Sequence, residues 1–187
     1  MACAVGRFQQ DQGSSACTTC SAGFAMATEG ALVCVACSAG KFQSGAGLSF
    51  CDDCPEGFFS MTIGSSSCEA CAAGSFAPKA SSTDCMPCAI GKYQGGTGQS
   101  VCVDCDKGKA VAVKGSTSCA PCSSGKHALS SGMEVCNACP AGTFSGPQAS
   151  ECQQCLEGTL SANAGGSSCD ECSGNTYRRQ VPRRHGP

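Results

Sequence analysis

The sequence predicts a small disulfide-rich repeat array. We expect an elongated rod of about eleven 17-residue units, mostly coil with short β-hairpins and with no large hydrophobic core. Three observations support this fold class: cysteines recur with a fixed period, 21 of the 187 residues are cysteine, and large apolar side chains are scarce. A fixed period indicates a repeat array in which each unit contacts mainly its neighbours.

The period is set by pairs of cysteines that flank two residues. Eight of these pairs follow one another at intervals of 17 residues, and two more follow after the loss of one residue. The pairs are Cys17/Cys20, Cys34/Cys37, Cys51/Cys54, Cys68/Cys71, Cys85/Cys88, Cys102/Cys105, Cys119/Cys122, Cys136/Cys139, Cys152/Cys155 and Cys169/Cys172. We number repeats from each opening cysteine, so repeat 1 runs from Cys3 to Cys17 and repeat 10 from Cys155 to Cys169.

Composition explains why such a chain needs cross-links. Ordering the backbone costs about 1–2 kcal/mol per residue, and large buried side chains must offset that cost. Aromatic residues make up only 5% of this chain, and it has no tryptophan. A cysteine content above about 8–10% is typical of disulfide scaffolds made in an oxidising compartment.

The repeats divide the chain into two parts. Ten complete units lie within residues 3–172, and residues 172–187 hold a truncated eleventh unit and a basic tail. Gly186 stands where the closing cysteine of the eleventh unit is expected. No signal peptide precedes Cys3, which predicts that the chain is a fragment or an incomplete gene model.

Glycine recurs at two positions of the repeat, where it supplies positive φ angles without steric cost. The first lies three residues after the opening cysteine, and the second lies four residues before the closing one. The first set is Gly6, Gly23, Gly40, Gly57, Gly74, Gly91, Gly108, Gly125, Gly142 and Gly158, and the second is Gly13, Gly30, Gly47, Gly64, Gly98, Gly115, Gly132 and Gly165.

Phenylalanine or tyrosine often follows the first glycine by two residues. We expect this ring to cover the disulfide and the next unit, because a unit has no other sizeable apolar group. Short strands after the first glycine and before the closing cysteine would form a two-stranded hairpin. The two-residue steps between units share no chemistry and are expected to be spacers.

Two disulfide pairings respect the period. Bridges across the long gap leave Cys172 unpaired, whereas bridges within each C-x-x-C leave Cys3 unpaired. Closing a loop of about 15 residues contributes about 3 kcal/mol in the chain-entropy model, and a four-residue loop contributes less and constrains nothing beyond itself. The long-gap pairing also leaves the odd cysteine in the unfinished unit, so we favour it. An interleaved pairing of each cysteine with its counterpart one repeat on stays open.

The favoured pairing leaves one cysteine free and uses the other twenty. The predicted bridges are Cys3–Cys17, Cys20–Cys34, Cys37–Cys51, Cys54–Cys68, Cys71–Cys85, Cys88–Cys102, Cys105–Cys119, Cys122–Cys136, Cys139–Cys152 and Cys155–Cys169, with Cys172 unpaired.

Two other chemistries use the same motif. C-x-x-C is a zinc half-site, so an intracellular zinc-binding array is a rival interpretation. A uniform period argues against it, because zinc ribbons use pairs two at a time. His127 lies at the aromatic position of its unit, where packing is expected, and His185 is at no ligand spacing. C-x-x-C is also a redox motif, as in residues 85–88 and 119–122, but that chemistry needs a helix after a strand.

Charge and motifs narrow the functional classes. The net charge is −2 and 14% of residues are charged, which gives no electrostatic footprint for nucleic acid. No apolar run approaches the roughly 20 residues that span a bilayer. The sequence has no catalytic triad pattern, phosphate loop or calcium-type acidic run. We therefore expect no catalytic, cofactor-binding or metal site, no cofactor and no enzyme activity.

Units such as Cys139-Pro-Ala-Gly-Thr-Phe144, with a C-x-x-C boundary, resemble the ephrin type A/B receptor-like cysteine-rich repeat. They are also similar to the first sub-module of tumour necrosis factor receptor cysteine-rich domains, which opens with C-x-x-G-[KT]-[FY]. The resemblance covers residues 3 to 177 and implies an extracellular, elongated and non-enzymatic region. Ala25 and Ala110, which replace the aromatic, and the short ninth unit depart from the pattern.

These inferences predict an extracellular cysteine-rich stalk or ectodomain region of a secreted or cell-surface protein. It would act as a spacer and as a binding surface for a protein or glycan ligand, within a larger secreted or membrane-anchored protein. The zinc-binding array and a thiol–disulfide redox protein are the alternatives.

Overall fold

The structure is a computed structural model that describes residues 2–11 and 16–172. The described chain consists of two-residue strands joined by turns and loops, and it contains no helix in these ranges. The predicted disulfide-rich repeat array with short hairpins is confirmed. The eleventh unit beyond Cys172, the basic tail and Gly13 lie outside the described residues.

Each repeat contributes one two-stranded hairpin, and each hairpin is a separate sheet. The paired strands are β1 (Arg7–Phe8) with β2 (Thr18–Thr19), β3 (Phe24–Ala25) with β4 (Val35–Ala36), β5 (Lys41–Phe42) with β6 (Asp52–Asp53), β7 (Phe58–Phe59) with β8 (Glu69–Ala70), β9 (Ser75–Phe76) with β10 (Met86–Pro87), β11 (Lys92–Tyr93) with β12 (Val103–Asp104), β13 (Lys109–Ala110) with β14 (Ala120–Pro121), β15 (Lys126–His127) with β16 (Asn137–Ala138), β17 (Thr143–Phe144) with β18 (Gln153–Gln154), and β19 (Thr159–Leu160) with β20 (Asp170–Glu171).

The second strand of each hairpin lies elsewhere than the sequence predicted. The first strand follows the first glycine as expected, but the second is the two-residue step after the closing cysteine. In repeat 3, Lys41 pairs with Asp53 and Phe42 pairs with Asp52. The amide of the next cysteine, Cys54, extends the pairing by donating to the Gly40 carbonyl oxygen at 2.9 Å. The steps are therefore strands held by backbone pairing, which explains why their side chains share no chemistry.

Backbone hydrogen bonds join each repeat to the next. Between repeats 3 and 4, the Gly40 amide donates to the Ser60 carbonyl oxygen at 2.8 Å and the Gln43 amide donates to that of Ser65 at 3.1 Å. In the other direction, the Gly64 amide donates to the Cys37 carbonyl oxygen at 2.7 Å. Equivalent bonds recur at the other repeat junctions, so main-chain groups that a small hairpin leaves unpaired find partners in the adjacent repeat.

Repeats also touch their next-but-one neighbours. A Cβ atom built on Gly57 of repeat 4 would lie 2.1 Å from the Gly98 carbonyl oxygen of repeat 6. The same approach places Gly23 against Gly64 and Gly125 against Gly165. The expectation that a repeat contacts mainly its neighbours was therefore incomplete.

Besides the first glycine, which is buried in repeats 1 to 8, the buried interior follows two positions of the repeat and does not follow the aromatic rings. The opening cysteines of repeats 1 to 9 are at most 2% exposed. The second buried position lies six residues after the opening cysteine, and the aromatic one residue earlier is only half-buried in each described case. The buried residues at this second position are Met26, Gln43, Ser60, Ala77, Gln94, Ala128, Ser145 and Ser161.

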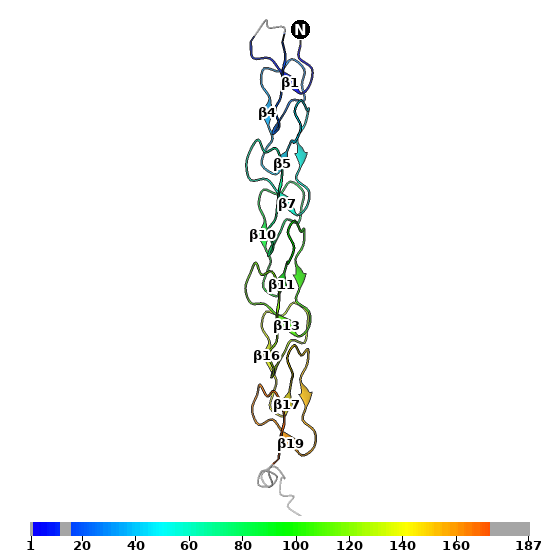
Figure 1. Ribbon diagram of the computed structural model, residues 1–187, viewed down its shortest axis with the longest axis vertical. Helices are drawn as coiled ribbons and strands as arrows, with labels where there is room; N and C mark the ends of the chain where they lie inside the picture. Colours follow the sequence, from blue (N-terminus) through cyan, green and yellow to red (C-terminus); the bar gives the residue numbers. More distant parts are fainter. Residues whose placement is uncertain (1, 12–15, 173–187) are drawn as a thin grey trace, which may run out of the picture. The chain divides into compact units, whose positions relative to one another are not determined.

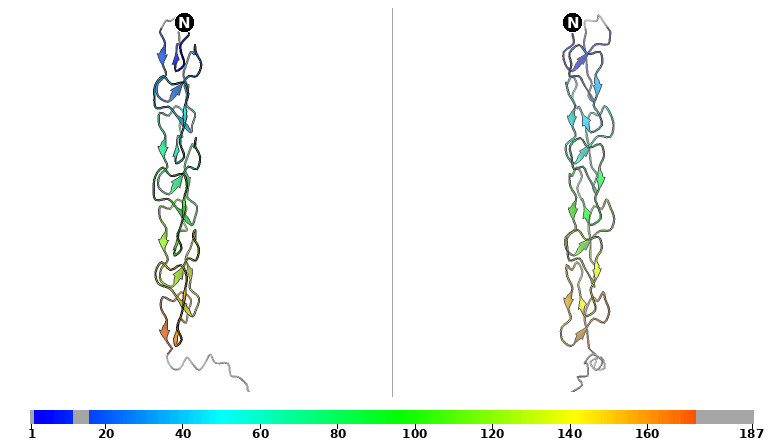
Figure 2. Two further views of the ribbon diagram at one scale, coloured as in Figure 1. Left: turned by 90° about the vertical axis from the view of Figure 1, so that its right-hand side faces the viewer. Right: turned by 180° about the vertical axis from the view of Figure 1, so that it is seen from behind.

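The chain divides into two compact units. The first comprises residues 1–89, 93–103 and 114–118, and the second comprises residues 90–92, 104–113 and 119–187. Within each unit, successive hairpins follow one another in chain order, with loops longer than the strands between them (Figures 1 and 2). No helix of the described residues has the length and hydropathy that crossing a bilayer would require.

Candidate functional site

The described chain holds ten disulfides, all of the long-gap kind, from Cys3–Cys17 to Cys155–Cys169. Nine of them join cysteines 14 residues apart, and Cys139–Cys152 joins cysteines 13 apart. Their Cα–Cα distances lie between 5.6 and 5.8 Å. Cys172 is half-exposed and is the free cysteine of the described residues.

Each C-x-x-C pair is divided between two bridges. Cys119 is bonded to Cys105 of repeat 7, and Cys122 is bonded to Cys136 of repeat 8. The pair at residues 85–88 is divided in the same way between repeats 5 and 6. The two sulfurs of each C-x-x-C motif therefore belong to two different disulfides. They do not form the internal disulfide that a C-x-x-C redox site uses.

Two buried glutamines form local polar centres that the sequence did not reveal. Gln43 is 2% exposed, and its Nε2 donates to the Phe50 carbonyl oxygen at 2.7 Å while its Oε1 accepts from the Gly45 amide at 3.1 Å. Gln94 makes the same two bonds in repeat 6. Each glutamine side chain forms hydrogen bonds with backbone groups of the loop before the closing cysteine. These bonds compensate for the cost of burying an amide.

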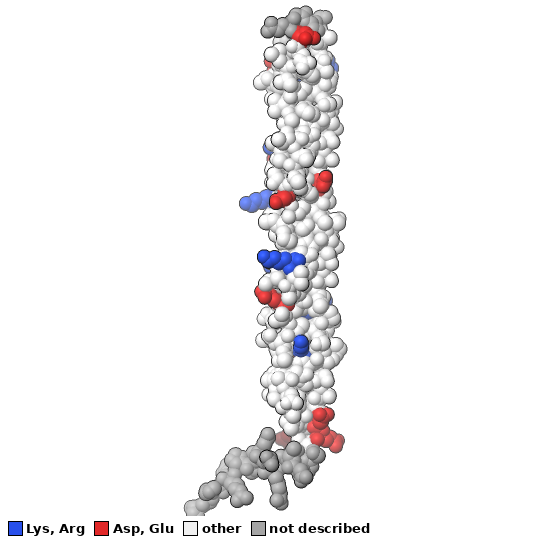
Figure 3. Space-filling model, turned by 90° about the vertical axis from the view of Figure 1, so that its left-hand side faces the viewer, with Lys and Arg blue, Asp and Glu red and all other residues white. Residues whose placement is uncertain are grey.

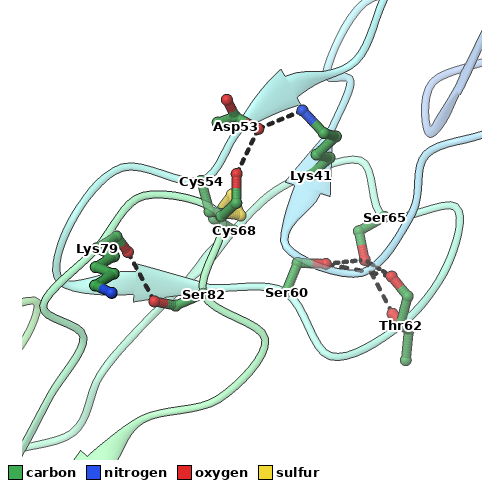
Figure 4. Close-up of a disulfide and its surroundings, with 10 residues drawn as sticks. Lys41, Asp53, Cys54, Ser60, Thr62, Ser65, Cys68, Lys79 and Ser82 are labelled. Atoms are coloured by element: carbon green, nitrogen blue, oxygen red, sulfur yellow. Dashed lines mark hydrogen bonds and ion pairs between the residues drawn. A yellow bond between two sulfur atoms is a disulfide. The ribbon is translucent and has the colours of Figure 1, made fainter.

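Repeat 4 places serine at the same buried position and satisfies it differently. The Ser60 hydroxyl donates to the Ser65 Oγ at 2.7 Å, and Ser65 donates to the Thr62 carbonyl oxygen at 2.9 Å (Figure 4). Ser145 of repeat 9 finds its partner in the preceding repeat, where its hydroxyl donates to the Lys126 carbonyl oxygen at 3.0 Å. The buried polar residues at this position therefore differ in how their hydrogen bonds are satisfied.

Asp53 links the hairpin of repeat 3 to repeat 5. Its carboxylate accepts hydrogen bonds from the Lys41 ammonium, across the β5–β6 hairpin, and from the Ser81 hydroxyl, 28 residues further along the chain. Figure 4 shows Lys41 and Asp53 beside the Cys54–Cys68 bridge. The Lys41 hydrogen bond, followed by that of Ser81, holds the pKa of Asp53 below its usual value.

Shallow grooves lie at equivalent junctions in the two units. In the first unit, a groove of about 370 Å³ lies between the β1–β2 hairpin of repeat 1 and repeat 2, and it is lined by Phe8, Phe24 and Val33 among others. In the second, a groove of about 410 Å³ lies between the β13–β14 hairpin of repeat 7 and repeat 8. Corresponding positions of the repeat line both grooves. The groove is therefore formed by the way that one repeat packs against the next.

The groove of the second unit is lined mainly by apolar side chains, with two charged residues among them. Ala110, Val111 and Pro121 line it from repeat 7, and Lys126 and Glu134 line it from repeat 8. Ala110 stands where several other repeats carry an aromatic ring. Charged side chains are few and scattered on the face drawn in Figure 3, so apolar and neutral polar groups dominate it.

Several apolar side chains are exposed at one recurring position, immediately before the closing cysteine. Val33, Phe50, Val101 and Val135 occupy it and are each more than half exposed. Val33 and Val135 also line the two grooves. This position therefore offers apolar contact area to a partner in both units.

His127 lies in a cluster that sequence reasoning missed. Its Nδ1 is 3.1 Å from the Sγ of Cys152, which belongs to the next repeat and is 25 residues away. We expected His127 to pack like the aromatic residues at its position, and it is half-buried as they are. No linear spacing signals the contact, because it arises from the stacking of repeat 9 on repeat 8.

A family model described as tyrosine-protein kinase ephrin type A/B receptor-like matches residues 23–71 and, overlapping, residues 43–84. No curated protein matches the chain in a sequence comparison. The ten regularly spaced disulfides establish tandem cysteine-rich repeats, as the sequence predicted, and residues 23–84 are similar to the ephrin receptor-like repeat. Such repeats and dense disulfides are typical of extracellular or cell-surface proteins.

Proposed function

We propose that this chain is a non-enzymatic, extracellular spacer whose repeat junctions also bind an extended segment of a partner protein. The recurring junction between repeats supports the spacer role. Each junction has the same backbone hydrogen bonds and is flanked by a disulfide on either side. Such a junction can be repeated without any change in the local structure, and a repeat array can therefore be lengthened unit by unit.

The state of the cysteines separates this proposal from its rivals. Mass spectrometry of the native protein after thiol alkylation is expected to find twenty oxidised cysteines and no bound zinc. Peptide mapping should join each opening cysteine to the closing cysteine of its own repeat. Reduced cysteines with stoichiometric zinc would instead support the intracellular zinc-binding array.

Spacer length can be tested by removing whole repeats. Deleting residues 37–53 or residues 37–87 takes out one or three complete repeats and leaves every remaining bridge its partner. The distance between spin labels at the two ends of the repeat array should fall about three times as far for the larger deletion. A distance that does not change with repeat number would contradict the spacer role.

The grooves support the binding role, and their composition favours a peptide over a glycan. The larger groove is lined by alanine, valine and proline side chains, and it has one lysine and one glutamate. Apolar side chains of a peptide gain by entering such a surface, whereas a glycan needs more polar partners. Peptide and glycan arrays probed with the oxidised chain distinguish the two ligands. A Val135→Asp variant should lose peptide capture, and Leu156→Asp, at an exposed position outside the lining of either groove, serves as the matched control.

A further inference from the structure

His127, Cys139 and Cys152 bring three metal-ligating atoms together in the second unit. Their ligand atoms all lie within 4.8 Å of one another, and among the described residues this is the only such group of three. The two sulfurs are joined as a disulfide, with His127 beside Cys152. None of the other nine bridges has a histidine of the described residues in such a group.

We propose that reduction of Cys139–Cys152 converts this cluster into a Zn²⁺ site, with the His127 Nδ1 and the two thiolates as protein ligands. Thiolates and imidazole are preferred zinc ligands, with bond lengths of about 2.3 Å for sulfur and 2.0–2.1 Å for nitrogen. Ligand atoms at the corners of a tetrahedron of that size lie about 3.5–4 Å apart. After reduction the two sulfurs must move apart to reach this spacing, whereas the imidazole nitrogen already lies within 4.8 Å of both. Water completes the fourth position.

Backbone hydrogen bonds also hold the segments that carry these ligands. The Cys139 amide donates to the Gly125 carbonyl oxygen at 2.8 Å, and the Cys139 carbonyl oxygen accepts from the Gly165 amide at 2.7 Å. On the histidine side, the Ala128 amide donates to the Ala149 carbonyl oxygen at 3.1 Å, which ties repeat 8 to the loop that carries Cys152. These bonds do not involve the sulfurs, and a Zn²⁺ ion bound by both thiolates would restore the cross-link that reduction opens.

Burial gives the site one open side. Cys139 is fully buried, whereas His127 and Cys152 are each half-buried. A reductant and a metal ion can approach from the Cys152 side, and the fully buried thiolate gains most from a bound cation because it has lost its contact with water. Repeat 8 differs from the others in carrying histidine at the aromatic position, so the site belongs to this junction alone.

The chemistry balances with a monothiol such as glutathione. Two glutathione molecules give two electrons and two protons to the Cys139–Cys152 bond, so that glutathione disulfide and two cysteine thiols form. Zn²⁺ then binds the two thiolates and releases both protons. Because only the reduced form binds the ion, Zn²⁺ shifts the equilibrium toward reduction of this bridge and of no other.

Linkage sets the size of the shift. The apparent equilibrium constant for reduction rises by the factor 1 + [Zn²⁺]/Kd, which is about 100-fold when free Zn²⁺ is 100 times its Kd. The full-length oxidised chain should be equilibrated in glutathione redox buffers, with and without buffered free Zn²⁺. Alkylation followed by peptide mapping then gives the reduced fraction of each bridge.

The expected result is a zinc-dependent shift at Cys139–Cys152 only, with one ion bound per chain. His127→Phe restores the residue type found at this position in other repeats and should abolish the shift, and His127→Gln should do the same. Co²⁺ in place of Zn²⁺ should give the visible absorption of a thiolate-bound tetrahedral ion, which Cys152→Ser removes. An equal shift in His127→Phe, a shift at another bridge, or no shift would each overturn the proposal.

Discussion

Two glycines at the same position of the repeat, Gly57 in repeat 4 and Gly142 in repeat 9, have different surroundings. Their φ angles are +83° and +82°, so each lies in the left-handed region that favours glycine. A Cβ atom on Gly57 would lie 2.1 Å from the Gly98 carbonyl oxygen, whereas one on Gly142 would meet no described atom within 4 Å. Glycine is therefore required for two reasons at Gly57, its positive φ angle and the close carbonyl oxygen. At Gly142 only the positive φ angle requires it.

The difference arises from the next-but-one contact. Interior repeats receive the carbonyl of a repeat two further on, and this close approach is possible only because the receiving residue lacks a side chain. Repeats 9 and 10 retain the shared backbone conformation, and for Gly142 and Gly158 no such carbonyl lies among the described residues. Substitutions that distinguish the two environments test whether this coupling stabilises the array.

Removing a bridge should give the largest difference. The double change Cys71→Ser and Cys85→Ser removes the disulfide of repeat 5, whose loop closure contributes about 3 kcal/mol to stability. We expect this change to lower amide protection in repeats 3 to 7. The matched change at Cys155 and Cys169 should affect repeats 8 to 10 of the described array. Hydrogen exchange mapped repeat by repeat measures both. Loss of protection confined to repeat 5 would show that next-but-one contacts contribute little.

Alanine in place of the two glycines should separate steric from conformational cost. Gly142→Ala is expected to destabilise its repeat by about 1–2 kcal/mol, the cost of a left-handed residue with a side chain. Gly57→Ala should add about 1–3 kcal/mol of overpacking against Gly98. Exchange of the Gly98 amide, which donates to the Cys71 carbonyl oxygen at 2.8 Å, reports on that contact. Equal effects of the two variants would contradict the close approach.

The buried position six residues after the opening cysteine offers a smaller contrast. Gln43→Ala leaves the Phe50 carbonyl and the Gly45 amide without their side-chain partner, and should cost about 1–3 kcal/mol. Ser161→Ala in repeat 10 removes one hydroxyl whose bond to the Asn163 carbonyl oxygen is 3.3 Å long, and should cost less. Local exchange rates in the two loops make the comparison. A larger effect for Ser161→Ala would show that these bonds do not stabilise the loops.

The pH dependence of Asp53 should give the smallest effect. Its pKa is lowered in the folded chain, so the carboxylate form favours folding. That contribution is present above the pKa of the unfolded chain and is lost as the pH falls through the folded value. In a carboxyl NMR titration, Lys41→Ala should raise the pKa of Asp53 most, and Ser81→Ala should raise it by less. No change with Ser81→Ala would mean that repeats 3 and 5 do not meet there in solution.

The sequence by itself determined the repeat, its boundaries and its class of structure. Cysteine spacing alone marks ten units, and recurring glycines indicate positive φ, which the described glycines of both sets adopt. Ser81 and Gln148, where the second glycine is missing, adopt positive φ as well, at 60° and 57°. Such properties are local, because a fixed offset within 17 residues imposes the same backbone on every copy.

Only the tertiary structure decided what the repeats do to one another. The register of stacking puts Gly57 under Gly98, Asp53 beside Ser81, and His127 beside Cys152, and each pair is separated by between 25 and 41 residues. It also turns the two-residue steps into strands and buries the residue after the aromatic in place of the aromatic itself. The physical reason is that a single repeat is too small to bury a side chain or pair all its backbone groups, so its surroundings are set by neighbours that its own sequence does not specify.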